Sequence, residues 1–109
     1  MKPIKLSDVA NWSGGELLRG VPADTVSALT TDTRKMSGGE LFIALKGDNF
    51  DAHDHLKDAI EKGAACLLAH ALPAETENCD VPIVKVRNSL TGLQQLARNY
   101  RRELGLSLI

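Results

Sequence analysis

Three short apolar runs and two segments with helical spacing limit what this chain can fold into. The runs are Leu41–Leu45, Cys66–Ala69 and Pro82–Val86, and each has the length of a buried strand. Leu56–Ile60 and Leu90–Leu104 carry apolar residues three or four positions apart, as one face of a helix does. In a chain of 109 residues, this order of strands and helices predicts a small single α/β domain with a mixed β-sheet flanked by helices.

The first third of the chain predicts shorter elements beside this sheet. Ser7 is placed to cap a short helix that Gly14 ends. Strands are expected at Glu16–Leu18 and Val26–Thr31, where apolar and β-branched residues gather. The polar segment Asp32–Gly39 predicts a loop.

The last four residues predict a boundary between two domains. Leu106–Ile109 follows Gly105 and has the apolar character of the first residues of a strand. We therefore expect one domain in residues 1–105 and the start of a second domain of a longer protein at 106–109.

Charge and hydropathy argue against several classes of partner. The chain has 13 basic and 14 acidic residues, and its densest basic cluster, Arg98, Arg101 and Arg102, fits a solvated helix face better than a nucleic-acid interface. No apolar run is long enough to span a membrane, and no signal peptide follows the first methionine. We expect a cytoplasmic domain in which Cys66 and Cys79 stay reduced.

No complete catalytic motif is visible. A phosphate-binding P-loop (G-x-x-x-x-G-K-[ST]), a Gly-x-Ser-x-Gly elbow and a Cys-x-x-Cys pair are all missing from the sequence. Asp51–His55 contains four residues of metal-ligand type, but His53 and His55 would point to different sides of a helix. Asp51 is better explained as the N-cap of that helix, so we expect no catalytic residue, metal site or cofactor site in this chain.

Two polar loops suggest a ligand site. Thr30–Arg34 ends a strand with three hydroxyls, a carboxylate and a guanidinium, which together can bind a polar, phosphorylated ligand. Lys46–Asp51 adds a base, a glycine, an amide and Phe50, which could stack on a flat ring such as a nucleobase. The alternative is structural: the acids cap turns, Arg34 is a surface charge and Phe50 belongs to the core. The residues alone favour neither.

These loops belong to a motif that extends along nearly the whole chain. It reads Asp32-Thr33-Arg34, Gly39-x-Leu41-Phe42-x-Ala44-Leu45-Lys46-Gly47 and Phe50-Asp51-x-His53. It continues as Ala59-x-x-x-Gly63-Ala64-x-x-Leu67-Leu68 and Val84-x-Val86-x-Asn88-Ser89-Leu90-x-Gly92-Leu93. The motif resembles the N-terminal domain of the Mur ligases, which build the peptide stem of bacterial cell-wall precursors.

The resemblance implies a role for the two loops. In this family the N-terminal domain holds the UDP part of the muramoyl-peptide substrate. Carried over by motif, the contacts to the uridine end fall on Thr31, Thr33, Asp48, Asn49 and Phe50. Arg34 and Lys46 are the expected neighbours of the phosphates.

The resemblance also implies what the intact enzyme would do in peptidoglycan synthesis. The motif is most like the branch that adds D-alanyl-D-alanine to UDP-MurNAc-tripeptide, with the tripeptide-forming branch as the alternative. ATP would phosphorylate the terminal carboxylate, Mg²⁺ would bridge the ATP phosphates, and the amine of D-alanyl-D-alanine would attack the acyl phosphate.

None of those reacting groups is expected in this chain, so we expect it to be inactive alone. Two readings outside enzymology stay open. The chain could be a stand-alone nucleotide-sugar-binding module, or a structural or protein-interaction domain without a small ligand.

Overall fold

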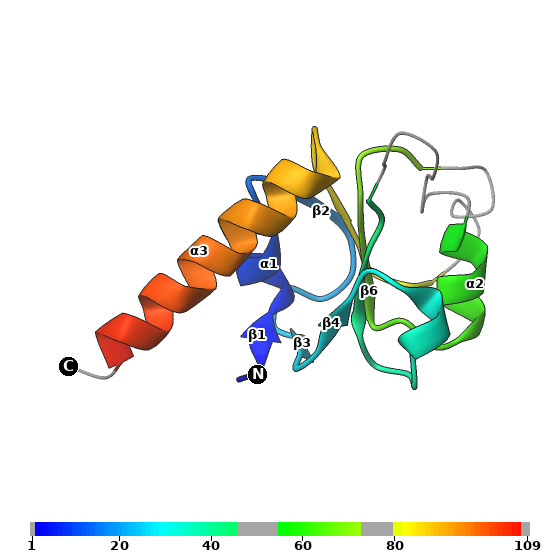
Figure 1. The fold of residues 1–109 in the computed structure, drawn as a ribbon, viewed down its shortest axis with the longest axis horizontal. Helices are drawn as coiled ribbons and strands as arrows, with labels where there is room; N and C mark the ends of the chain where they lie inside the picture. The colour runs from blue at the N-terminus through cyan, green and yellow to red at the C-terminus, as the bar shows by residue number, and fades with distance from the viewer. Residues whose placement is uncertain (1, 46–54, 73–79, 108–109) are drawn as a thin grey trace.

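A five-stranded mixed sheet lies at the centre of the fold (Figure 1). The structure is a computed structural model that describes residues 2–45, 55–72 and 80–107. Across the sheet the strands are β2 (Glu16–Arg19), β7 (Ile83–Lys85), β6 (Cys66–Ala69), β5 (Leu41–Ile43) and β4 (Leu29–Thr30). β4, β5, β6 and β7 run parallel, and β2 pairs antiparallel with β7, so the predicted mixed sheet is confirmed.

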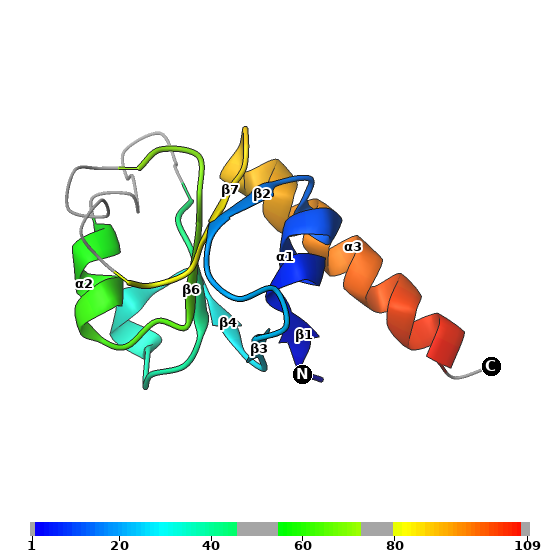
Figure 2. The same cartoon turned by 180° about the vertical axis from the view of Figure 1, so that it is seen from behind.

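Helices cover both faces of this sheet (Figures 1 and 2). α1 (Leu6–Ser13) and α3 (Ser89–Ser107) pack against each other on one face, and α2 (Leu56–Glu61) covers the other. β1 (Ile4–Lys5) and β3 (Thr25–Val26) pair antiparallel and form a separate two-stranded ribbon. Within the described residues, no helix has both the length and the apolar character needed to cross a membrane.

The central strands are apolar on both sides because each side meets a helix. Leu41 and Ile43 of β5 belong to the core beneath α1 and α3. Phe42 and Ala44, which alternate with them, belong to the core beneath α2. Successive side chains of a strand point to opposite faces, so a strand buried on both faces needs an unbroken apolar run.

The single strand expected at Val26–Thr31 is in fact two strands. β3 pairs with β1, whereas β4 pairs with β5 of the main sheet. The prediction was wrong here because the two halves have different partners, one before this segment in the chain and one after it.

Ser7 does not cap the first helix. α1 begins at Leu6, and no side chain makes a capping hydrogen bond there. Backbone carbonyls replace it: Leu6 N donates to Asp24 O over 2.8 Å, and Ser7 N donates to Pro22 O over 3.1 Å. These two bonds satisfy amide groups that a helix start would otherwise leave without partners.

The two ends of the last helix differ in how well the sequence predicted them. Asn88, one of the two expected caps, accepts a hydrogen bond from Thr91 N over 3.0 Å. The other end was predicted wrongly, because α3 continues through Gly105 to Ser107 where a strand was expected to begin at Leu106. A helix satisfies its hydrogen bonds internally, whereas a strand needs a neighbouring strand to pair with. The division of domains at residue 105 stays a prediction.

The N-cap expected for the second helix lies outside the described residues. Asp51, the expected N-cap, is not among them, and in the described part α2 begins at Leu56 with His55 at the N-cap position. Gly63 follows the helix with φ of 84°, a conformation that favours glycine, which confirms it as the C-terminal stop.

Candidate functional site

The first predicted loop, Thr30–Arg34, follows β4, and the second, Lys46–Asp51, follows β5 in the sequence. β4 and β5 are neighbouring parallel strands, so the segments that follow them leave the sheet at the same edge. This confirms the expected adjacency of the two strands. Four predicted site residues of the second loop lie outside the described residues: Lys46, Asp48, Asn49 and Phe50.

A pocket of about 560 Å³ lies where the first loop faces α2. The loop forms a 3₁₀ turn, η1 (Thr33–Lys35), which lies next to α2 in Figures 1 and 2. The lining residues are Thr31, Asp32, Thr33, Arg34, Phe42, His55, Asp58 and Lys62. The pocket therefore brings together three predicted site residues, Thr31, Thr33 and Arg34.

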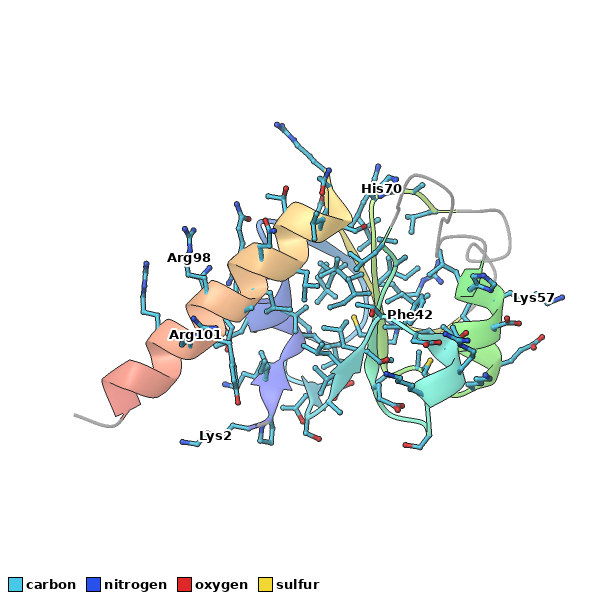
Figure 3. All side chains as sticks on the ribbon, viewed as in Figure 1. Lys2, Phe42, Lys57, His70, Arg98 and Arg101 are labelled. Carbon is cyan, nitrogen blue, oxygen red and sulfur yellow. The ribbon has the colours of Figure 1, made fainter. Side chains whose placement is uncertain are left out.

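Phe42 joins this pocket to the core. Its side chain is only 1% exposed and packs in the cluster beneath α2, with Leu56 and Ala59. It also lines the pocket, and Figure 3 shows it at the centre of the molecule, where the sheet meets the side covered by α2. Sequence reasoning had placed it only in a buried strand, so its contribution to the pocket was missed.

Asp32 and Arg34 form a two-pronged ion pair at the pocket's rim. Arg34 Nε donates to Asp32 Oδ1 over 3.1 Å, and Nη2 donates to Oδ2 over 2.9 Å. These bonds and one from the Arg34 backbone amide lower the pKa of Asp32 to about 2. Asp32 in turn raises the pKa of Arg34. Arg34 is still 87% exposed, so the pair sits in solvent and contributes little to folding by itself.

The same aspartate shapes the loop. Its Oδ1 accepts a hydrogen bond from Arg34 N over 2.9 Å and so caps η1. Thr30 Oγ1 accepts from Asp32 N over 3.1 Å, which fixes the turn just after β4. The structural alternative considered for Asp32, that it caps a turn, is therefore correct. It coexists with a place in the pocket wall.

Glu40 fixes the return of this loop into β5. Its carboxylate is almost buried and accepts hydrogen bonds from Ser37 N and Gly38 N, each over 2.7 Å. The bond from Ser37 is the main reason that the pKa of Glu40 lies below its usual value. Gly39 N also donates to Gly63 O over 2.8 Å, so the loop is attached to the end of α2.

α2 supplies a second pocket wall that sequence reasoning missed. Lys62 Nζ donates to Thr33 O over 2.9 Å, and His55 Nδ1 lies 3.5 Å from Asp58 Oδ2. The signal was present in the sequence, because positions 55, 58 and 62 are three and four apart and share one face of a helix.

The cysteine that the structure describes is structural. Cys66 is completely buried in β6, and burial raises the pKa of its thiol to about 12. A thiol with so high a pKa is a poor nucleophile near neutral pH, which supports the reading made from the sequence. Cys79 lies outside the described residues.

Comparison with known proteins agrees with this architecture. The model of the Mur ligase family, catalytic domain, matches residues 25–101. The UDP-N-acetylmuramoyl-tripeptide–D-alanyl-D-alanine ligase of Bacillus subtilis is 39% identical over 101 residues, which cover 86% of this chain and 22% of that protein. The ligase of the same name from Escherichia coli is 36% identical over 104 residues, covering 95% of this chain and 22% of that protein.

Two further similarities widen the comparison. The UDP-N-acetylmuramoyl-L-alanyl-D-glutamate–2,6-diaminopimelate ligase of Cytophaga hutchinsonii is 35% identical over 75 residues, which cover 69% of this chain and 15% of that protein. A crystal structure of MurF from Acinetobacter baumannii superposes with a TM-score of 0.80 at 24% identity, covering 95% of this chain and 22% of that one, which shows a shared fold. The chain thus spans about a fifth of the length of the curated relatives it matches most extensively. Since the family model matches well over half of its residues, the chain belongs to the Mur ligase family.

Proposed function

We propose that this chain is the N-terminal domain that holds the UDP end of UDP-MurNAc-tripeptide in an ATP-dependent ligase that adds D-alanyl-D-alanine. The observation that carries the proposal is the pocket in which Thr31 and Thr33 lie beside Phe42, at the sheet edge where the loop after β5 also leaves. The relatives at 39% and 36% identity, which bear the name of this ligase, support the choice of reaction.

Each side chain of the pocket has a distinct part in this proposal. The hydroxyls of Thr31 and Thr33 can both donate and accept hydrogen bonds, as the polar edge of a uracil ring or ribose requires. Phe42 gives the pocket an apolar floor. Asp48, Asn49 and Phe50 follow β5 in the sequence and would complete the uridine site from the other loop.

In this proposal ATP and Mg²⁺ bind outside this chain. The sequence has no Gly-Lys-Ser/Thr for phosphate binding, and the described residues hold no group of three or more acidic, His or Cys side chains that could bind a metal ion. In the proposal both bind the remaining part of the ligase, in the cytoplasm where its precursors are made.

The chain's own contribution is to position the substrate. The UDP group lies at the far end of the substrate from the carboxylate that reacts. Binding energy from such a remote group can orient the reacting atoms and so raise the rate. We therefore expect the chain alone to bind substrate without turning it over.

The diaminopimelate-adding branch is a second candidate, favoured by the Cytophaga hutchinsonii relative. Both branches would use the same UDP grip, so the pocket does not distinguish them. Supplying the intact ligase with each pair of substrates distinguishes the two branches. Amide formation from UDP-MurNAc-tripeptide and D-alanyl-D-alanine supports the first candidate. Amide formation from UDP-MurNAc-dipeptide and diaminopimelate supports the second.

A titration of the ¹⁵N-labelled chain with UDP-MurNAc-tripeptide tests the binding role. We expect the amide signals of Thr31–Arg34 to move. Thr33→Ala should weaken binding about three- to tenfold, because one net hydrogen bond contributes about 0.5–1.5 kcal/mol. Asn49→Ala tests the second loop in the same way.

Thr25→Ala is the matched control, since Thr25 is exposed on β3 and does not line the pocket. Unmoved signals at Thr31–Arg34, or an equal loss of affinity in Thr25→Ala and Thr33→Ala, would contradict the proposed site.

A further inference from the structure

Lys62 is a pocket-lining cation that has no acidic partner in the described part of the chain. Its Nζ donates to the carbonyl oxygen of Thr33 over 2.9 Å, and no carboxylate of residues 2–45, 55–72 or 80–107 lies within ion-pair distance. An ammonium group has three N–H donors, so two remain after this bond. A carbonyl carries no net charge, so among the described residues the ammonium group of Lys62 forms a hydrogen bond at the pocket but no ion pair.

Arg34, one of the two cations expected beside the phosphates, forms an ion pair with Asp32. Its guanidinium spans both carboxylate oxygens of Asp32, at 3.1 and 2.9 Å. A phosphate that took over these donors would leave the Asp32 carboxylate beside it, and two like charges would then face each other. Arg34 is therefore better suited to holding Asp32 than to holding a phosphate.

A simpler explanation of Lys62 is the helix end on which it sits. Basic residues are common there because they interact favourably with the last carbonyls of a helix. However, the hydrogen bond that the Lys62 side chain makes among the described residues runs to Thr33 of η1, 29 residues earlier in the sequence, and not to a carbonyl of α2. The side chain thus joins the two walls of the pocket.

We propose that Lys62 binds the phosphate of a nucleotide held in this pocket, while Arg34 acts as a positioning residue for Asp32 and the η1 turn. This inference rests on the proposed function, since it assumes that the pocket takes the UDP end of the substrate. It adds the residue that distinguishes a nucleotide from a nucleoside. Asp58 lies one turn earlier on α2 and also lines the pocket, so its carboxylate moderates the attraction.

A comparison of two probes, UDP and uridine, isolates the phosphate contribution. The ratio of their dissociation constants is measured from the amide signals of Thr31 and Thr33 in the 109-residue chain. Lys62→Met should reduce the preference for UDP about two- to fivefold, the range expected for a solvent-exposed ion pair. The ratio matters because loss of the bond to Thr33 could weaken both probes equally.

Two further variants serve as controls. Lys57→Met removes the same charge from the same helix, but Lys57 does not line the pocket and points outward into solvent in Figure 3. It should keep the wild-type ratio. Lys62→Arg keeps the charge and the donors, and should restore most of the preference for UDP.

The possible outcomes separate this inference from the proposed function. A wild-type chain without preference for UDP, a wild-type ratio in Lys62→Met, or an equal change in Lys57→Met would overturn the role of Lys62 while uridine binding still supported the pocket. Failure of the wild-type chain to bind either probe would count against the pocket assignment itself, and against this inference with it.

Discussion

At the scale of single residues, Asp32 has two tasks in the loop after β4. It caps η1 through Arg34 N and it holds the Arg34 guanidinium, and together these bonds lower its pKa to about 2. A carboxyl group whose pKa is lower in the folded state stabilises the fold above its unfolded pKa, which is near 3.8. That contribution is lost as the pH falls from about 4 to about 2.

Replacing Arg34 should therefore change the titration of Asp32. In Arg34→Met we expect the pKa of Asp32 to rise from about 2 toward 3.8, because the side-chain hydrogen bonds that favour the ionised form are gone. Carboxyl ¹³C chemical shifts followed against pH measure this directly. Lys35→Met is the control and should move the pKa much less, since Lys35 acts only through its charge. A wild-type pKa near 3.8 would show that the ion pair does not form in solution.

The pocket residues show what the sequence could and could not reveal at this scale. Thr31 and Thr33 were found because hydroxyls gather visibly where a strand ends. The spacing of positions 55, 58 and 62 indicated a shared helix face, but the bond from Lys62 to Thr33 was not predictable, because it joins positions 29 apart that meet only once the fold has formed. The predicted contacts of Asp48, Asn49 and Phe50 stay predictions.

At the scale of elements, the two longer helices begin in different ways. α3 uses the side chain of Asn88, and the local pattern was enough to predict it. α1 uses the carbonyls of Pro22 and Asp24, which come from a turn more than ten residues later, so a local pattern pointed wrongly to Ser7. Caps made by a residue's own side chain are predictable from sequence, and caps supplied by distant backbone are not.

Removing the cap of α3 tests this distinction. Asn88→Ala should lower the free energy of unfolding by about 1 kcal/mol, the usual effect of losing a side-chain cap. Asn88→Asp keeps an acceptor for Thr91 N and should stay close to the wild type. Urea denaturation followed by circular dichroism measures both. If Asn88→Ala unfolded at the wild-type midpoint, the capping bond would contribute nothing to stability.

At the scale of the whole molecule, the sheet couples two cores. The apolar runs of β5 and β6 predicted buried strands, and the structure buries every residue of both. The order of the strands and the separate β1–β3 ribbon were not predictable in this way. They depend on pairing between segments that are distant in the sequence, and short apolar runs do not specify which strands pair or in which register.

Substitutions on opposite faces of the sheet should therefore lower one shared unfolding transition. Leu56 of α2 and Leu96 of α3 are both buried, one in each core. Replacing either by Ala should lower the free energy of unfolding by about 2–5 kcal/mol. Trp12, the only tryptophan, packs against the core beneath α1 and α3 and reports on that face by fluorescence.

The informative variant is Leu56→Ala, which lies on the face away from Trp12. We expect its denaturation midpoint to fall equally by Trp12 fluorescence and by circular dichroism, as in a two-state transition. A fluorescence midpoint that stayed at the wild-type value would mean that the two faces unfold independently.

Phe42 has a consequence for how such a pocket can diverge among related enzymes. Phe42 lines the pocket, where we propose it as the apolar floor, and it is also a buried part of the core. A smaller side chain would enlarge the pocket and leave a void in the core by the same change, so selection for a new ligand and selection for a folded protein act on one position in opposite directions. Thr31 is exposed at the pocket's edge and carries no such conflict. Adaptation to different ligands is therefore expected to proceed through the rim of the pocket and to leave its floor unchanged.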